Sequence, residues 1–535
     1  MEIARKKNAP LEQRQRLSRS VLWQLQRNFF DRQGIEAWRT SGVPYHITSN
    51  PFIAAAYAKV VFGFLRDCHA AAAASDSSPS LDPAQPLYVV ELGSGHGRFG
   101  YLFLKRFLKT YRASVLRGVP FKYVLTDFTE RNLEYWQSHP WLRPFIDEGV
   151  LDLALFNVEH DGELRLVNSG EVLSAETLRN PLAVIANYVF DSVPQDAFVI
   201  QGGQLYESLV TVSAPRKGPA HDDPEILPGL EISYTANPAE GNYYGDPEWD
   251  RILQECRERL PNTAFLFPLA ALQCVRNFRR LSRGRMLLLS ADKGYNRDEA
   301  LLQGQGIPGI VMHASFSMMV DYHIIGRYFL NGGGQAMHPT HQHEHLNISA
   351  FTLGGPPGGY AETRQAYAEA VEDFGPDDFF TLTERFEMAR GGLSFPQMLA
   401  LLRLSGWDHL IFRGCLSALK EHVAEIPEAQ KHELHRAVRQ VWDAYYPIGE
   451  EDDLAFQLGT LLLEMEFYSE ALELLRHSVD LYGAEPGTAY NMAVCFYGLR
   501  QTEKALECVG QAIELDPEFD AAKALRIQLQ SAAAR

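Results

Sequence analysis

The residues best suited to chemistry lie where an apolar run meets an acid and three glycines, in the order Val89-Val90-Glu91-Leu92-Gly93-Ser94-Gly95-His96-Gly97. Glycines let the backbone adopt positive φ and approach a ligand closely, and the first N–H groups of a following helix favour an anionic group. The β-branched run before the glycines and the apolar segment 99–108 after them predict a strand, a tight turn and a helix. The pattern therefore predicts a nucleotide-type loop, although a plain tight turn in an α/β domain has the same glycines.

The spacing of the glycines indicates the ligand. A dinucleotide fingerprint, G-x-G-x-x-G, would need a glycine at Arg98, whereas the third glycine is Gly97. The pattern E-x-G-x-G-x-G closely resembles motif I of class I S-adenosylmethionine (SAM) methyltransferases, whose loop holds the methionine moiety of SAM. The resemblance implies that Gly93, Gly95 and Gly97 contact the cofactor through their backbone and that Glu91 serves its methionyl end.

Polar side chains end three further predicted strands. The segment 121–126 leads to Asp127, which can accept hydrogen bonds from both ribose hydroxyls, or alternatively can cap the helix that follows. The segment 150–156 leads to Asn157, a candidate for the adenine edge. The apolar segment 181–187 predicts a central parallel strand that leads to Asn187 and Asp191, at the sheet edge where open α/β sheets place their chemistry.

The predicted elements around these strands complete an α/β domain. A hairpin is expected over 197–213 with Gly202 and Gly203 at its turn. Helices are expected over 11–40, 52–68 (capped by Ser49 or Asn50), 248–260 and 269–281, and strands over 285–290 and 346–351.

Residues from about 45 to 350 resemble the MidA-like family of class I SAM-dependent methyltransferases, whose mitochondrial members are complex I assembly factors. The similar segments are 47–50, 91–97, Asp127, 187–194, the hairpin and 292–295. The resemblance implies a Rossmann-like methyltransferase sheet with SAM as cofactor, and it implies that Asn187 and Asp191 face the methyl acceptor. One position departs from the family, because Tyr188 replaces its glutamate. Acidic groups hold a guanidinium in arginine methyltransferases, so this departure weighs against an arginine acceptor.

A histidine-rich stretch, His338-Pro339-Thr340-His341-Gln342-His343-Glu344-His345, follows three glycines. If extended, it would place His341, His343 and His345 on one face, where they suit zinc, and a metal-dependent hydrolase or oxygenase is then a rival function. We favour a polar loop with no metal, in which a histidine near the methyl acceptor can serve as a base.

The C-terminal part of the chain is patterned as helices and contains a repeat. Gly459 and Ala471 recur as Ala493 and Ala505, a shift of 34 residues in both cases, which resembles the tetratricopeptide repeat (TPR). Residues 450–535 hold 16 Asp and Glu against 6 Lys and Arg. An acidic repeat surface suggests docking of a basic protein partner, whereas acidic helix faces also simply keep a protein soluble.

Composition limits the class of protein. The six cysteines are scattered, no apolar segment of membrane-spanning length occurs, and the formal net charge is −17. These features predict a cytoplasmic protein that binds neither nucleic acid nor membrane.

Four regions are expected: an N-terminal helical segment (1–80), a methyltransferase domain (81–355) with a hairpin and helical insertion (about 197–281), a helical connector (356–449) and a TPR-like all-α domain (450–535). The predicted function is methyl transfer from SAM to an acceptor, more readily a protein side chain because a repeat domain is appended. A catalytically silent scaffold with the same fold is the alternative that Tyr188 keeps open.

Overall fold

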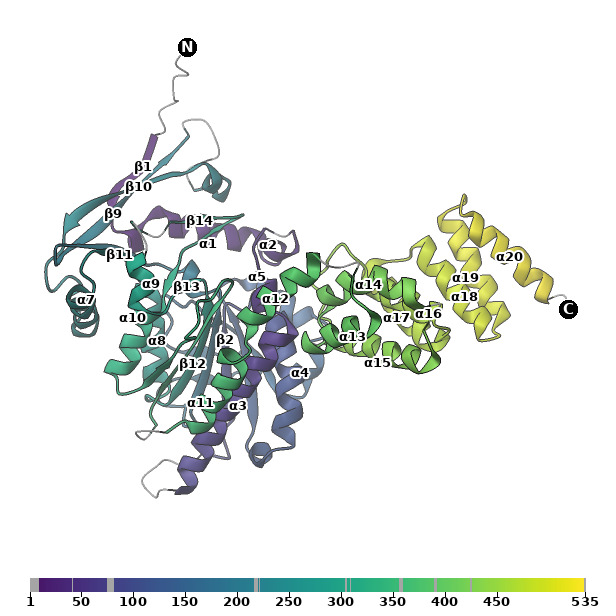
Figure 1. Cartoon of the computed structure of the whole chain (residues 1–535), viewed down its shortest axis with the longest axis horizontal. Helices are drawn as coiled ribbons and strands as arrows, with labels where there is room; N and C mark the ends of the chain where they lie inside the picture. Colours follow the sequence, from purple (N-terminus) through teal and green to yellow (C-terminus); the bar gives the residue numbers. More distant parts are fainter. Residues whose placement is uncertain are drawn as a thin grey trace, which may run out of the picture. The chain divides into compact units, whose positions relative to one another are not determined.

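The computed structural model describes residues 9–40, 42–74, 81–215, 220, 222–303, 306–307, 309–355, 359–388, 392–423 and 426–533. The chain divides into two compact units, Met1–Thr381 and Leu382–Arg535. The first unit is mixed α/β, and the second is helical throughout its described residues (Figure 1). Of the Gly/Pro-rich boundary expected near 355, residues 356–358 lie outside the described part of the chain.

A seven-stranded sheet in the order β17-β18-β12-β7-β2-β3-β4 lies at the centre of the first unit. The five strands from β12 to β4 are parallel, whereas β18 is antiparallel to β12 and β17 to β18. The strands are β2 (Leu87–Leu92), β3 (Phe121–Asp127), β4 (Leu151–Leu155), β7 (Leu182–Asn187), β12 (Met286–Asp292), β17 (Gln335–Met337) and β18 (Asn347–Leu353). The expected central strands are therefore present, because apolar runs buried on both faces favour parallel pairing.

Helices cover both faces of this sheet. On one face α3 (Pro51–Ala74) packs beside α4 (Arg98–Arg112) and α11 (Ala361–Tyr367) (Figure 1). The other face shares a hydrophobic core with α7 (Pro247–Arg259), α8 (Leu269–Leu281) and α10 (Tyr322–Asn331). The remaining helices of the unit are α1 (Val21–Gln33), α2 (Glu36–Arg39), α5 (Glu130–Ser138), α6 (Arg143–Asp147), α9 (Asp298–Gln303) and α12 (Pro376–Met388), with 3-10 turns η1 (Leu17–Arg19), η2 (His46–Thr48), η3 (Val115–Gly118), η4 (Phe190–Ser192) and η5 (Pro224–Gly229) and a π-helical turn η6 (Ala368–Glu372).

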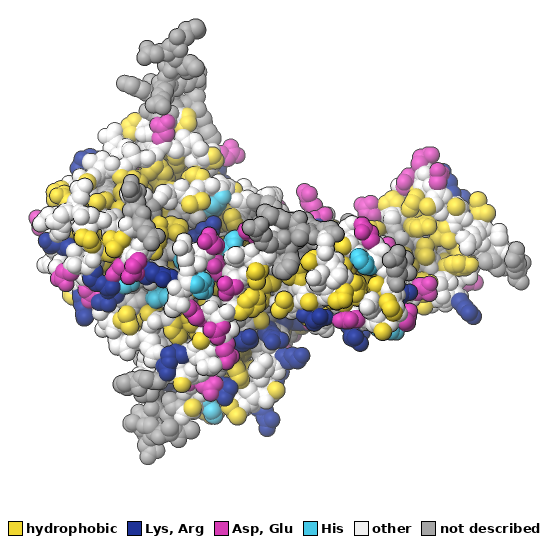
Figure 2. Space-filling view, in the orientation of Figure 1, with side chains coloured by type: hydrophobic (Ala, Val, Ile, Leu, Met, Phe, Trp, Pro, Cys, Tyr) yellow, Lys and Arg dark blue, Asp and Glu magenta, His cyan; other side chains and the backbone are white. Residues whose placement is uncertain are grey.

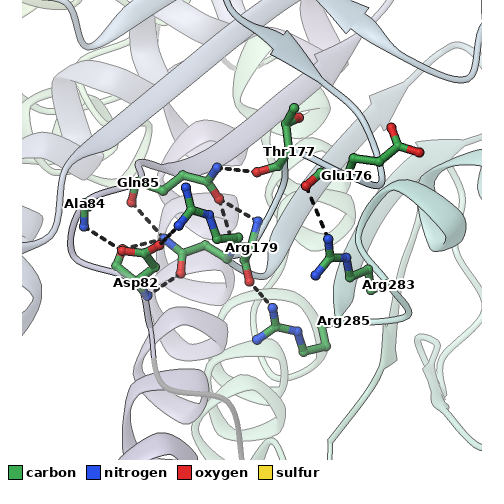
Figure 3. Close-up of polar contacts among 9 residues, drawn as sticks. Asp82, Ala84, Gln85, Glu176, Thr177, Arg179, Arg283 and Arg285 are labelled. Atoms are coloured by element: carbon green, nitrogen blue, oxygen red, sulfur yellow. Dashed lines mark hydrogen bonds and ion pairs between the residues drawn. The ribbon is translucent and has the colours of Figure 1, made fainter.

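The amino ends of the parallel strands are tied together by side chains from the turns that precede them (Figure 3). Gln85, just before β2, accepts a hydrogen bond from the backbone N–H of Arg179 (2.6 Å) and donates to the carbonyl of Thr177 (2.8 Å). The Arg283 guanidinium, just before β12, donates to the carbonyl of Ala175 (2.8 Å). These bonds fix the amino edge of the sheet and leave the opposite, carboxyl edge for a site.

An antiparallel sheet in the order β1-β9-β8-β11, with β10 also paired to β9, is built around the predicted hairpin. Gly202 and Gly203 both have positive φ at its turn, as a two-residue hairpin loop requires. The strands are β1 (Ala9–Gln15), β8 (Asp196–Gln201), β9 (Gln204–Ala214), β10 (Glu231–Pro238) and β11 (Thr263–Phe267). Three two-stranded pairs complete the unit: β5 (Leu164–Arg165) with β6 (Val172–Leu173), β13 (Gly294–Tyr295) with β16 (Val320–Asp321), and β14 (Val311–Met312) with β15 (Phe316–Ser317).

The helix expected over 11–40 is wrong for its first residues. Residues 9–15 form β1, because the free edge of β9 offers backbone partners that outweigh local helix preference. Helix begins only at Val21, where the Ser20 hydroxyl accepts a hydrogen bond from the N–H of Leu22 (3.3 Å).

The expected connector, 356–449, is shared between the two units. Helix α11 is joined to α3 by Asp67, whose carboxylate accepts hydrogen bonds from the N–H groups of Glu362 (3.1 Å) and Thr363 (2.8 Å). Phe379 of α12 stacks on Phe52 of α3, with 4.5 Å between ring centroids.

The second unit is a series of antiparallel helices with one hydrophobic core that extends from α13 to α20. Gly459 and its repeat equivalent Ala493 are buried, as are Ala471 and Ala505, and a side chain at Gly459 would meet Leu475 at 3.0 Å. Small residues therefore allow close helix packing at the predicted positions. The helices are α13 (Phe395–Leu404), α14 (His409–Val423), α15 (Glu428–Ala444), α16 (Leu454–Glu464), α17 (Tyr468–Tyr482), α18 (Pro486–Gly498), α19 (Thr502–Leu515) and α20 (Asp520–Ala533).

All six cysteines are free thiols, and five of them are buried. Within the described parts of the chain, no helix combines the length and the apolar character needed to cross a membrane.

Candidate functional site

A cavity of about 290 Å³ lies at the carboxyl edge of the parallel strands. The strand order reverses between β2 and β7, and open α/β sheets bind ligands at such a switch point. The cavity is lined by seven of the eight predicted site residues: Glu91, Gly93, Gly95, Asp127, Asn157, Asn187 and Asp191. Gly97 does not line it and instead precedes the first residue of α4.

The glycine loop is held in a conformation that other residues rarely adopt. Gly93 and Gly95 have φ of +56° and +52°. A Cβ at Gly93 would meet Val189 Cγ2 at 2.9 Å, and a Cβ at Gly95 would meet Trp38 Cζ2 at 2.9 Å. Both positions thus need glycine for conformation and for space.

Glu91 is a buried acid beneath this loop. Its Oε2 accepts a hydrogen bond from the Tyr123 hydroxyl (2.8 Å). Burial raises the pKa of Glu91 to about 8, although the hydrogen bond from Tyr123 opposes this rise. At neutral pH the side chain is therefore largely protonated, which lets it donate as well as accept.

Asp127 braces the loop from the end of β3. Its carboxylate accepts hydrogen bonds from the N–H groups of Gly95 (3.2 Å) and Thr129 (3.1 Å) and from Asn132 Nδ2 (2.9 Å). The cap of α5 is Thr129, whose hydroxyl accepts from the N–H of Asn132 (3.3 Å). Burial raises the pKa of Asp127, and these hydrogen bonds oppose the rise.

Asn157 lies just beyond β4, where its Oδ1 accepts a hydrogen bond from the N–H of Glu159 (2.9 Å). Asn132, which the sequence reasoning missed, also lines the cavity, and its Oδ1 is buried without a hydrogen-bond partner among the described residues. No spacing rule identifies Asn132, because its placement depends on the bond to Asp127.

The turn after β7 is strained. Tyr188 has φ of +53°, uncommon for a bulky residue, and its N–H donates to the carbonyl of Ala291 on β12 (2.9 Å). Just before it, Asn187 Oδ1 accepts a hydrogen bond from the Tyr57 hydroxyl (2.8 Å). The strain and the bond together fix how Asn187 and Tyr188 line the cavity.

Two carboxyl groups meet beneath this turn. Burial raises the pKa of Asp191 to about 6, while hydrogen bonds from Ser192 and Asp292 favour its charged form. Burial and the nearby Asp191 raise the pKa of Asp292 well above its usual range, and its Oδ2 accepts from the Tyr322 hydroxyl (2.8 Å). The pair therefore holds a proton at neutral pH.

The N-terminal segment contributes one wall of the cavity, which the sequence reasoning placed only as a helix on the domain. Trp38 of α2 stacks on Phe30 of α1 (centroids 5.9 Å apart) and meets His96 edge-to-face at 5.9 Å. Arg27 of α1 forms an ion pair with Glu159. Aromatic residues within an expected helix do not reveal which surface they cover, so this wall had no sequence signal.

The histidines of the 338–345 loop point to different partners. His338 Nδ1 lies 2.8 Å from the Ser349 hydroxyl, and His343 Nε2 lies 2.9 Å from the carbonyl of Gly294. The turn is held instead by Asp377, which accepts from the N–H groups of Glu344, His345 and Leu346. Among the described residues, no three His, Cys, Asp or Glu side chains form a group suited to a metal ion.

No protein-family model matches the chain. Intraflagellar transport protein 70A of Danio rerio is 35% identical over 65 residues, which are 12% of this chain and 10% of that protein. The chain thus spans about a tenth of the length of this curated relative.

Two solved structures that align with the chain are COG1565 superfamily proteins. An uncharacterized COG1565 superfamily protein from Burkholderia thailandensis covers 62% of this chain and 88% of its own, at 12% identity and a TM-score of 0.37. A COG1565 superfamily member and inferred methyl transferase from the same organism, bound to S-adenosyl-homocysteine, covers 65% and 96%, at 14% identity and a TM-score of 0.34.

A further solved structure that aligns with the chain is MamA (41-end) from Desulfovibrio magneticus RS-1, which covers 29% of this chain and 84% of its own, at 18% identity and a TM-score of 0.24.

Proposed function

We propose that the chain is a class I SAM-dependent methyltransferase with a Rossmann-like sheet, of the MidA-like type. The observation that carries the proposal is the convergence of the glycine loop, its buried acid and the polar strand ends on one cavity at the switch point of the sheet. A plain tight turn with no ligand would not need two left-handed glycines beside a cavity lined by polar residues from four strands.

The cavity residues suit the parts of SAM. Gly93 and Gly95 line the cavity and can offer it their backbone, and Glu91 lies beneath the loop for the methionyl end. Asp127 is assigned to the ribose and Asn157 to the adenine edge. Asp127 already accepts three hydrogen bonds, so an ionised carboxylate with about four acceptor positions has room for one more donor rather than two.

The sulfonium of SAM supplies an already activated methyl group. The chain's residues then have to orient the acceptor for in-line attack and exclude water, and such positioning can lower a barrier by about 7–11 kcal/mol. Asn187 and Asp191 at the strained turn are assigned to the methyl acceptor. The aromatic wall of Trp38 and Phe30 excludes water from the glycine-loop side.

The helical unit is assigned to docking. We infer a TPR-like array from the repeated buried small residues at a 34-residue shift, and a protein acceptor or partner from its attachment to the catalytic unit. Figure 2 shows hydrophobic side chains gathered on one face of the helices near the C-terminus, and Ile527 of α20 is 65% exposed. Exposed apolar surface of this kind suits a protein partner.

A catalytically silent scaffold is the second candidate, and Tyr188 is the observation that favours it. Calorimetry with SAM, followed by incubation with methyl-labelled SAM and lysate proteins, tests both. Tight binding with label transfer supports the methyltransferase, tight binding without transfer supports the scaffold, and absence of SAM binding overturns the methyltransferase.

A further inference from the structure

The part of the cavity formed by the turn after β7 and its neighbours has a distinct hydrogen-bonding character. We call it the methyl-acceptor end and define it as residues 187–192, Lys293 and His313, all of which adjoin the cavity or its strained turn. Residues 318–320 link the turn to Lys293, because the N–H of Met318 donates to the carbonyl of Asp191 (2.9 Å) and the N–H of Val320 donates to the carbonyl of Lys293 (3.0 Å). Its charges and free hydrogen-bonding atoms indicate the group that it can bind.

Asn187 contributes a donor. Its Oδ1 is taken by the Tyr57 hydroxyl at 2.8 Å, so only the amide nitrogen remains. That nitrogen is buried and has no hydrogen-bond partner in the described part of the chain. A buried amide without a partner is unfavourable, so a ligand atom that accepts from it is favoured.

His313 and Tyr188 contribute donors as well. The N–H of Ser315 donates to His313 Nδ1 (3.1 Å), so the hydrogen of the neutral ring is on Nε2. Burial lowers the pKa of His313, which keeps the ring neutral. Burial raises the pKa of Tyr188, so its hydroxyl keeps its proton.

Lys293 adds a positive charge. Lys293 lines the cavity, and its exposed side chain has no ion-pair partner among the residues that the structure describes. Of the two acids nearby, Asp292 is buried and its pKa lies well above its usual range, so it adds little charge. Asp191 keeps its charge at neutral pH, and one of its oxygens accepts from the Ser192 hydroxyl (2.8 Å). Donors therefore outnumber acceptors at this end.

We propose that the methyl acceptor is a carboxylate, in a protein side chain or a chain terminus, so that the product is a methyl ester. The inference rests on the proposed methyltransferase function. A carboxylate only accepts hydrogen bonds and is negative, which matches Asn187 Nδ2, His313 Nε2 and Lys293. A guanidinium or ammonium only donates and would leave these donors unpaired.

The transfer balances without a base. A carboxylate oxygen attacks the methyl carbon, the new C–O bond forms as the C–S bond breaks, and the electron pair of that bond stays on sulfur. The products are a methyl ester and a neutral thioether, and no proton is released. A site without a general base is therefore sufficient.

The test uses the full chain, methyl-labelled SAM and three capped tripeptides with Glu, Gln or Arg at the centre, together with lysate proteins. Methyl esters are hydrolysed by mild alkali, whereas N-methyl groups are stable. We expect label on the Glu peptide and on lysate proteins that is released as methanol by alkali. Label that survives alkali overturns the carboxylate proposal but supports the methyltransferase, and absence of any transfer overturns both.

Binding gives a second readout that does not depend on turnover. With S-adenosylhomocysteine present, NMR saturation transfer should show the Glu peptide bound in preference to the Gln peptide. Lys293→Gln should reduce that preference about tenfold or more, as expected for a charge-assisted hydrogen bond. Lys109→Gln, which removes the same charge from an exposed position on α4, is the matched control and should have no effect.

Tyr188→Glu provides a reversal test, because it adds an acid at the position where the resemblance places one. We expect it to weaken binding of the Glu peptide and to strengthen binding of the Arg peptide. An unchanged order of the three peptides in both Lys293→Gln and Tyr188→Glu would show that this end of the cavity does not select the acceptor.

Discussion

At the scale of single residues, Gly95 shows how one position serves both the fold and the site. Its N–H donates a hydrogen bond to the Asp127 carboxylate, and its carbonyl accepts one from the Trp136 indole (2.9 Å). The absence of a Cβ leaves space for Trp38. A glycine predicted for the cofactor's approach is thus also required by the protein's own packing.

Gly95→Ala should therefore destabilise the chain and abolish SAM binding. Gly202→Ala is the matched control, because Gly202 has a similar φ of +56° but nothing within 4 Å of its added Cβ. Each variant should lose about 1–3 kcal/mol of unfolding free energy, because alanine is strained in a left-handed backbone conformation. Gly95→Ala should lose more, because Trp38 must shift. Urea unfolding and calorimetry measure the two effects. Normal SAM affinity in a folded Gly95→Ala variant would contradict the assignment.

Asp127→Ala should weaken SAM binding by about 1.5–3 kcal/mol, the scale of a hydrogen bond to a charged group. The loss combines the ribose contact with the release of Gly95 and Asn132. Glu130→Ala is the control, because Glu130 is an exposed acid at the first position of α5. Calorimetry that shows equal losses for the two variants would place the ribose contact elsewhere.

Glu91 should make stability depend on pH. Its folded pKa of about 8 lies above its ordinary value, so the folded state holds a proton that the unfolded state has released. The stabilisation is complete below the ordinary pKa of a glutamate and is lost as pH rises through about 8. Glu91→Gln has no titratable group at this position. Urea unfolding at several pH values should show the wild type losing stability toward alkaline pH relative to Glu91→Gln, and parallel curves would refute this.

At the scale of elements, the sequence predicts what local patterns determine. Apolar β-branched runs and the Gly202-Gly203 turn located the central strands and the hairpin, and Asn50 caps α3 as one of the two expected residues (Phe52 N–H to Asn50 Oδ1, 3.0 Å). Pairing between distant segments had no such signal. Residues 9–15 pair with β9 some two hundred positions later, and Trp38 and Phe30 form a wall of a cavity whose other residues lie far along the chain.

The cap of α11 gives a test at this scale. Asp67→Ala removes the acceptor for two N–H groups and the Thr363 hydroxyl (2.7 Å), and should cost about 1–2 kcal/mol, as loss of a helix N-cap does. Arg66→Ala removes the half-exposed ion pair with Glu362 and a contact with the Phe62 ring, but no bond to the α11 backbone, and should cost less than about 1 kcal/mol. Hydrogen exchange of residues 361–367 should rise only in Asp67→Ala. Equal protection in the two variants would show that packing alone holds α11.

At the scale of the whole molecule, the core of the second unit has no break at the expected boundary near 449. The Tyr445 hydroxyl and the N–H of Ile448 both donate hydrogen bonds to the Glu450 carboxylate. The same hydrophobic core includes Val441 and Leu454. A cut at Gly449 would therefore divide one core, and the two units are better separated after Met388, the last residue of α12.

A chain that ends at Met388 should bind SAM as the full chain does, because the cavity belongs to the first unit. If the helical unit docks a protein acceptor, the truncated chain should show a raised KM with little change in kcat, since remote binding affects ground and transition states alike. Steady-state methylation of the same protein by both chains measures this. Loss of SAM affinity on truncation would show instead that the second unit supports the cavity.

The buried thiols allow the opening rate of each unit to be measured separately. Cys256 and Cys274 lie in the first unit and Cys415, Cys495 and Cys508 in the second. Burial raises the pKa of Cys274 and, to about 12, that of Cys495, so neither thiolate forms while its unit is folded. An alkylating reagent therefore modifies each cysteine only when its surroundings open. Mass spectrometry of the labelled peptides at increasing urea then reports the opening rates of the two units in one experiment, without an added probe.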